Sequence, residues 1–153
     1  MNTRLSLCLA FLASSLLSSC STASVQSRRE AHFSPARDAS VCLLTSSSLQ
    51  SLYGAPAIET GDTGVSRTQM VEDALIRKGF TTTSVPFSAD YGLSLSLKPG
   101  EGIYKLEGAL YQMESGSPGS LCWKGSSAIA GKPETRMAAE IALLKALMQR
   151  FPN

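Results

Sequence analysis

The sequence predicts an α+β fold: a two-layer sandwich in which two helices pack on one face of a mixed sheet of four to five strands. Two observations lead to this class. Two helix-like segments enclose a series of consecutive strand-like segments, and a short apolar segment at residues 41–44 precedes the first helix. Because a helix separates that first strand from the others, it can pair in parallel, whereas the later strands follow one another through turns and pair antiparallel.

The first helix is predicted to begin at Ser66 and to end at Lys78. Ser66 and Gln69 have the spacing of a capping box, in which each side chain bonds a backbone N–H of the first turn. Gly79 follows the last turn, where a glycine ends many helices, and Phe80 is placed for the apolar contact of a Schellman motif. These local signals define both ends of the helix.

Four strand-like segments follow the helix. Alternating Leu and Ser residues in the second segment predict one buried face and one face with hydroxyl groups. In the third segment, Lys105 and Glu107 share a face, and in the fourth Leu121 shares a face with Trp123. Glycine-containing turns between the last three segments predict antiparallel neighbours. The segments are 81–87, 93–97, 103–113 and 121–127.

The last helix is predicted from Pro133, which suits the first helical position, to about Arg150. Pro152 then ends it. Its apolar stripe is wide, as expected of a helix that lies on a sheet. The members of the stripe are Met137, Ile141, Leu143, Leu144, Leu147, Met148 and Phe151.

The N-terminus has the features of a signal peptide. An apolar segment at residues 5–17 follows one basic residue, Arg4, and is too short to cross a membrane as a helix. The Leu-Ser-Ser-Cys sequence at 17–20 resembles the lipobox of bacterial lipoproteins. The resemblance implies cleavage between Ser19 and Cys20, with acyl chains such as palmitate attached at Cys20 and inserted in the membrane. The alternative is an ordinary secretory signal peptide, in which Cys20 has no role in cleavage or lipid attachment.

The resemblance also implies a location. Ser21 stands where many inner-membrane lipoproteins have Asp, which favours the periplasmic face of the bacterial outer membrane. Residues 21–39 are rich in Ser and Ala without an apolar period, as is typical of a flexible tether. We therefore expect a signal peptide at 1–19, a lipidated N-terminus and tether at 20–39, and one α+β domain at 40–153.

The charge and the apolar content of the chain limit the kinds of partner that it is expected to bind. Loss of Arg4 with the signal peptide leaves 13 of the 14 basic residues against 12 acidic ones. A charge so close to zero predicts no nucleic-acid partner. No later stretch approaches the ~20 apolar residues of a membrane-spanning helix, so we expect the acyl chains on Cys20 to be the membrane attachment.

Two cysteines remain in the predicted domain, Cys42 and Cys122, in a compartment that permits oxidation. A disulfide between them would close a loop of about 80 residues and stabilise the fold by ~4 kcal/mol in the chain-entropy model. The alternative is two buried thiols that pack as small apolar groups. We expect the disulfide, although the sequence does not determine the distance between the two residues.

Catalytic and metal-binding patterns are absent from the sequence. His32 is the only histidine and falls in the predicted tether, which cannot hold a base beside a nucleophile. Asp62, Thr63 and Gly64 match the short motif of aspartic proteases, but they lie in a polar loop without the second carboxylate that such enzymes need. Phosphate-binding glycine loops and clustered metal ligands are also missing. We expect no enzyme activity, no metal and no cofactor.

Three segments have counterparts in a group of bacterial proteins. They are Val-Glu-Asp-Ala-Leu-Ile-Arg-Lys-Gly-Phe at 71–80, Leu-Cys-Trp-Lys-Gly at 121–125 and Arg-Phe-Pro at 150–152. Together they resemble small uncharacterised bacterial lipoproteins whose domain is similar to the TolB amino-terminal domain. The resemblance implies this fold, an envelope location and, by analogy with ring-forming relatives, an oligomer. It supplies no catalytic residues.

Two hypotheses for function follow. In the first, the chain is a lipid-anchored, periplasm-facing envelope lipoprotein that acts as a non-enzymatic accessory or scaffold protein, with an envelope protein as partner. The alternative is a small-ligand or glycan-binding module of the envelope. Its candidate ligand-facing residues are Tyr104, Tyr111 and Trp123, beside the hydroxyl groups of Ser94 and Ser96. A lone Trp in an alternating strand is also a common core residue, so both interpretations of Trp123 remain.

Overall fold

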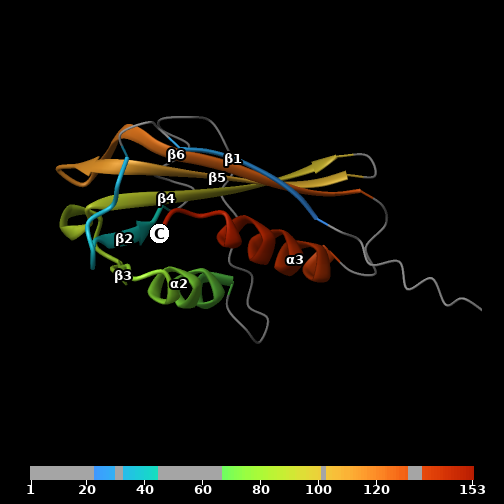
Figure 1. Ribbon diagram of the computed structural model, residues 1–153, viewed down its shortest axis with the longest axis horizontal. Coiled ribbons are helices and arrows are strands. Elements are labelled where there is room, and N and C mark those ends of the chain that lie inside the picture. Colours follow the sequence, from blue (N-terminus) through green and yellow to red (C-terminus); the bar gives the residue numbers. More distant parts are fainter. Residues whose placement is uncertain (1–22, 30–32, 45–66, 101–102, 131–135) are drawn as a thin grey trace, which may run out of the picture.

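The computed structural model describes residues 23–29, 33–44, 67–100, 103–130 and 136–153 (Figure 1). The two α-helices of these residues lie on one side of a six-stranded sheet (Figure 1). We call the sheet face toward these helices the inner face and the opposite face the outer face. The elements are β1 (Ser24–Arg29), β2 (Ser40–Leu43), α2 (Arg67–Arg77), β3 (Thr81–Thr82), the 3-10 helix η1 (Pro86–Ser88), β4 (Tyr91–Gly100), β5 (Ile103–Glu114), β6 (Ser117–Ala130) and α3 (Arg136–Gln149).

The sheet is mixed and has six strands in the order β1-β6-β5-β4-β2-β3. β2 pairs in parallel with β3 and β4, and β4, β5, β6 and β1 pair antiparallel in succession. The predicted α+β class, with a mixed sheet and two helices, is confirmed. The predicted number of strands is too low because β1 has no apolar period by which to recognise it.

Part of the predicted tether is a strand. β1 runs antiparallel to β6, with Ser24 opposite Ala128. Most of its side chains are exposed, so its formation depends on backbone hydrogen bonds to β6 rather than on burial of an apolar face. The prediction of a flexible tether is therefore wrong for these residues, and the sheet begins ahead of the predicted domain boundary at residue 40.

The C-terminal end of α2 confirms the predicted end of the first helix. The Gly79 N–H donates to the Ile76 carbonyl oxygen at 3.0 Å, and the Phe80 N–H donates to that of Leu75 at 3.1 Å. These two bonds form a Schellman motif, with Gly79 at a φ of 86°. Glycine suits this position because it has no Cβ to clash at positive φ. Ser66, the predicted N-cap, lies outside the described residues.

The core lies between the inner face and the two helices. Leu93, Leu95 and Leu97 of β4 belong to it, as their alternation with serines predicts. The wide apolar stripe of the last helix is also confirmed, since Leu143 and Leu147 of α3 are fully buried. The other large members of the core are Val41, Val71, Leu75, Phe80, Leu106, Leu110, Trp123, Ile129, Leu144, Met148 and Phe151.

A pair of glycines makes room for Trp123 beneath α3. Gly108 of β5 lies directly opposite Gly125 of β6. A Cβ on Gly125 would overlap the Trp123 ring, and a Cβ on Gly108 would approach the Leu147 side chain to 2.9 Å. Since carbon atoms in favourable contact are ~3.5–4.0 Å apart, neither position accepts a side chain without movement of its neighbours. The Trp123 ring meets the Phe151 ring edge-on, with centroids 5.0 Å apart.

A β-bulge changes which side chains of β6 share a face. Leu110 opposes Trp123 and Tyr111 opposes Leu121, so Cys122 is an extra residue on β6. Leu121 is 39% exposed, whereas Trp123 is 2% exposed in the core. The prediction that these two residues share a face is therefore wrong, because simple alternation does not hold across a bulge.

Cys42 and Cys122 are both thiols, and the predicted disulfide is absent. Cys42 packs with Leu44 and Ala89 in a small cluster on the outer face, whereas Cys122 belongs to the inner core. Their strands, β2 and β6, are separated by β4 and β5. Three steps of ~4.8 Å between strands make on the order of 14 Å, which is about twice the longest Cα separation that a disulfide spans. Burial also raises the pKa of the Cys42 thiol, which disfavours the reactive thiolate.

Candidate ligand-binding site on the outer face

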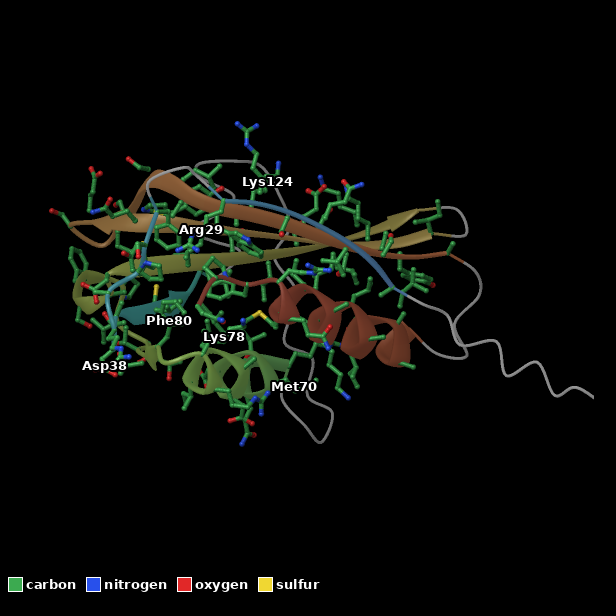
Figure 2. All side chains as sticks on the ribbon, viewed as in Figure 1. Arg29, Asp38, Met70, Lys78, Phe80 and Lys124 are labelled. Atoms are coloured by element: carbon green, nitrogen blue, oxygen red, sulfur yellow. The ribbon has the colours of Figure 1, made fainter. Side chains whose placement is uncertain are left out.

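Charged side chains form a regular pattern on the outer face of β1, β6, β5 and β4. Strand pairing arranges the outward residues in three rows that cross these strands, with four basic side chains and one acidic side chain among them. Figure 2 shows Lys124 on the side of the sheet away from the helices, opposite Lys78 and Phe80. The first row is Ser24, Ala128, Lys105 and Lys98; the middle row is Gln26, Ser126, Glu107 and Ser96; the third row is Arg28, Lys124, Ala109 and Ser94.

Glu107 is ion-paired with the two lysines of the first row. Its Oε1 lies 2.8 Å from Lys105 Nζ, and its Oε2 lies 2.7 Å from Lys98 Nζ. Hydrogen bonds donated by Lys105 and Lys98 lower the pKa of Glu107 to about 2, against the opposing effect of partial burial. The two lysines lie directly opposite each other on β4 and β5. The carboxylate therefore offsets the repulsion between these like charges.

Replacing Glu107 by glutamine is expected to lower the free energy of unfolding at pH 7 by about 1 kcal/mol, because the two lysines are half exposed and solvent screens the pairs. The folded-state pKa is lowered from 4.5 to about 2, so the stabilisation is fully present above pH 4.5 and is lost as the pH falls through about 2. Urea unfolding of both proteins across this pH range would measure the difference. Glu114→Gln on the same strand is the control, since no ion pair of Glu114 occurs within the described residues. Equal effects of the two substitutions would contradict the ion-pair explanation.

Arg28 and Lys124 form a second pair of like charges directly opposite each other. Both residues are exposed, and among the described residues neither has an ion-pair partner. Arg29, the next residue, is engaged: its Nε donates to the Phe33 carbonyl oxygen at 2.6 Å, and its guanidinium lies 5.4 Å from the centre of the Phe33 ring. Like charges directly opposite each other destabilise a sheet. An anion bound between Arg28 and Lys124 would remove this repulsion and accept charge-assisted hydrogen bonds.

A hollow of about 510 Å³ lies over the same strands. Its size falls within the ~300–1,000 Å³ that is typical of small-ligand sites. Side chains of both basic rows line it, so one ligand can contact both. The lining residues are Gln26, Ser27, Arg28, Lys105, Glu107, Leu121, Lys124, Gly125 and Ser126.

The ligand-facing residues expected from the sequence do not come together. Trp123 is buried in the core, where no ligand on the outer face can reach it. Tyr104 packs against the inner core and Tyr111 against the outer-face cluster of Cys42, so the two rings lie on opposite faces. Ser94 and Ser96 are on the outer face as expected, but they are only 9% and 6% exposed.

The basic residues of the outer face were not predicted as a group. Alternation in β5 correctly places Lys105 and Glu107 on one face. Arg28, however, falls in the predicted tether, and a net charge near zero gives no indication of a local excess of positive charge. The register between β1 and β6 brings Arg28 opposite Lys124. No short-range pattern in the sequence encodes that register.

A second hollow, of about 620 Å³, lies between α2 and α3. Apolar side chains such as Met70 and Met148 line it together with both acidic and basic residues, including Asp73 and Lys145. Its three basic residues and one acidic residue, Arg77, Lys78 and Lys145 with Asp73, give it the same charge balance as the outer-face hollow. One of these charges is already bonded within the fold, since Lys78 Nζ donates to the Phe151 carbonyl oxygen at 2.8 Å.

The structure bears on only part of the other predictions. Within the described ranges, no three metal-ligating side chains come together. The helices of the described segments are too short or too polar to cross a membrane. The predicted cleavage and lipidation site at Ser19 and Cys20, the histidine at position 32 and the motif at 62–64 lie outside the described residues.

Comparison with known proteins identifies distant structural neighbours. No family model matches the chain, and no curated protein matches its sequence. A dodecameric PelC from Paraburkholderia phytofirmans superposes with a TM-score of 0.48 at 17% identity, over 86% of this chain and 99% of that one. A protein of the DUF330 family from Xanthomonas campestris superposes with a TM-score of 0.38 at 14% identity, over 82% of this chain and 86% of that one. Both neighbours are bacterial proteins. Similarity at this level supports neither a shared ligand nor a shared assembly.

Proposed function

We propose that this chain is a lipid-anchored, non-enzymatic accessory protein of the bacterial cell envelope that holds an anionic envelope component on the outer face of its sheet. The observation that supports binding most directly is the exposed Arg28–Lys124 pair, two like charges on neighbouring strands without an acidic partner in the described chain. The lipobox-like sequence that ends at Cys20 supports the anchor and the location at the periplasmic face of the outer membrane.

The lipid anchor and the basic outer face would act together. Acyl chains on Cys20 would confine the domain to the membrane surface, because each buried methylene contributes ~0.8 kcal/mol. β1 begins at Ser24, only a few residues after Cys20, and contributes Arg28 to the outer face. One of the proposed anion-binding residues, Arg28, therefore lies close in sequence to the anchor. This arrangement suits a protein that retains an envelope component at the membrane without converting it chemically.

Replacing both Arg28 and Lys124 by serine is expected to weaken binding of a polyanion at least ~10-fold, since each lost charge-assisted hydrogen bond is worth ~1.5–3 kcal/mol. The measurement uses the full-length protein, purified from membranes in a nonionic detergent, and compares dextran sulfate with uncharged dextran at low ionic strength. Binding to dextran sulfate should also weaken as salt is added.

The matched control is Arg77→Ser with Lys145→Ser, which removes the same charge from the helix side of the molecule. This control should retain the affinity of the wild-type protein for dextran sulfate. If both double variants lose affinity equally, only net charge matters and the outer face is not the site.

A further inference from the structure

The two basic rows of the outer face are separated by a row without basic side chains. Lys98 and Lys105 lie in the first row, and Arg28 and Lys124 lie in the third. Successive residues on one face of a strand are ~6.8 Å apart, so the two basic rows are on the order of 14 Å apart along the strands. A ligand that contacts both rows has widely spaced anionic groups with other atoms between them.

The middle row is suited to hydroxyl groups. Gln26 offers an amide donor and acceptor, Ser126 offers a hydroxyl group, and Glu107 offers carboxylate oxygens. Since the pKa of Glu107 is about 2, its carboxylate is ionised at neutral pH. A ligand with densely spaced anionic groups would place one of them against this carboxylate and be repelled. Hydroxyl groups in the same position would instead donate hydrogen bonds to it.

The shape of the site favours a small ligand unit over a membrane surface. The basic side chains line a hollow of about 510 Å³, whereas a lipid surface would need a broad contact. Leu121, which is 39% exposed, adds apolar surface to the lining. Sugar rings combine apolar C–H faces with hydroxyl groups, and uronic acid units add carboxylates at intervals.

We infer that the outer face binds a carboxylate-bearing glycan, an inference that rests on the proposed function and specifies its ligand. A carboxylate of the glycan binds between Arg28 and Lys124, and sugar hydroxyl groups bind to Gln26, Ser126 and Glu107. Lys105, at the other end of the hollow, is available to a second carboxylate if the glycan displaces its contact with Glu107.

The test compares three anionic probes with the full-length protein in nonionic detergent at low ionic strength: oligogalacturonate, polyphosphate of equal charge, and glycerophosphoglycerol, the water-soluble headgroup of phosphatidylglycerol. We expect oligogalacturonate to bind most tightly. Gln26→Ala should weaken oligogalacturonate binding about fivefold, the equivalent of one neutral hydrogen bond, and should leave polyphosphate binding unchanged. Gln112→Ala is the control, because Gln112 is an exposed residue of β5 that does not line the hollow.

Glu107→Gln provides a second, independent readout. It removes the central negative charge and releases both lysines of the first row, so polyphosphate binding should strengthen at least ~10-fold, more than oligogalacturonate binding does. Tighter binding of polyphosphate or of glycerophosphoglycerol by the wild-type protein would overturn the glycan inference and leave anion binding intact. Binding of none of the three probes would overturn the proposed function as well.

Discussion

Trp123→Ala is expected to lower the free energy of unfolding by ~3–5 kcal/mol, a large part of the ~5–15 kcal/mol that keeps a domain folded. The ring is 2% exposed and meets Phe151 edge-on. Its removal would leave a cavity above Gly108 and Gly125, two positions that have no side chain to move into the space. Urea unfolding followed by circular dichroism would measure the loss.

Leu121→Ala is the matched control for this prediction. Leu121 lies two residues away on the same strand, but it is 39% exposed on the other side of the bulge. Its truncation should cost less than ~1 kcal/mol, because most of the lost surface already contacts water. Similar losses for the two variants would mean that both side chains lie in one core, as simple alternation predicts.

Cys20→Ser is expected to abolish incorporation of radiolabelled palmitate and to prevent removal of the leader. The expected physical consequence is loss of membrane attachment by acyl chains, since two chains or more are needed for stable anchoring and one binds only reversibly. The experiment expresses the full-length protein in bacteria and separates the membrane and periplasmic fractions. The radiolabelled palmitate on the protein and the mass of the protein are then measured in each fraction.

Cys8→Ser is the control for this experiment, because Cys8 precedes the predicted cleavage site and leaves with the leader. It should label as the wild-type chain does. A wild-type protein that loses its leader without taking up label would show that the lipobox-like sequence is incidental. The anchor would then be absent from the proposed function, while the binding properties of the outer face would be unaffected.

The elements that were predicted well are those with short-range signals. The Schellman motif at Gly79 and Phe80 involves only neighbouring residues, and the Leu–Ser alternation of β4 follows from strand geometry alone. β1 was missed for the complementary reason: an edge strand of mostly exposed residues has no burial pattern, and its formation depends on a partner about 100 positions away. The same explanation applies to the disulfide, which required a distance that strand order determines.

The candidate site shows the same contrast between short-range signals and long-range strand pairing. Alternation was sufficient to group Lys105 with Glu107, since they belong to one strand. Pairing Arg28 with Lys124 required the register between two strands, and the bulge at Cys122 then moved Leu121 to the hollow. The net charge of the chain, which is near zero, does not reveal these local concentrations of positive charge.

Local chemistry in the chain was thus enough to establish the α+β class, the C-terminal end of α2 and the expectation of a lipid-modified N-terminus. Strand order and register established the rest: six strands, two separated thiols, a buried Trp123 and a basic outer face. The physical reason is the range of the interactions. Caps, turns and alternation act over a few residues, whereas long-range strand pairing depends on the packing of the whole sheet against its helices.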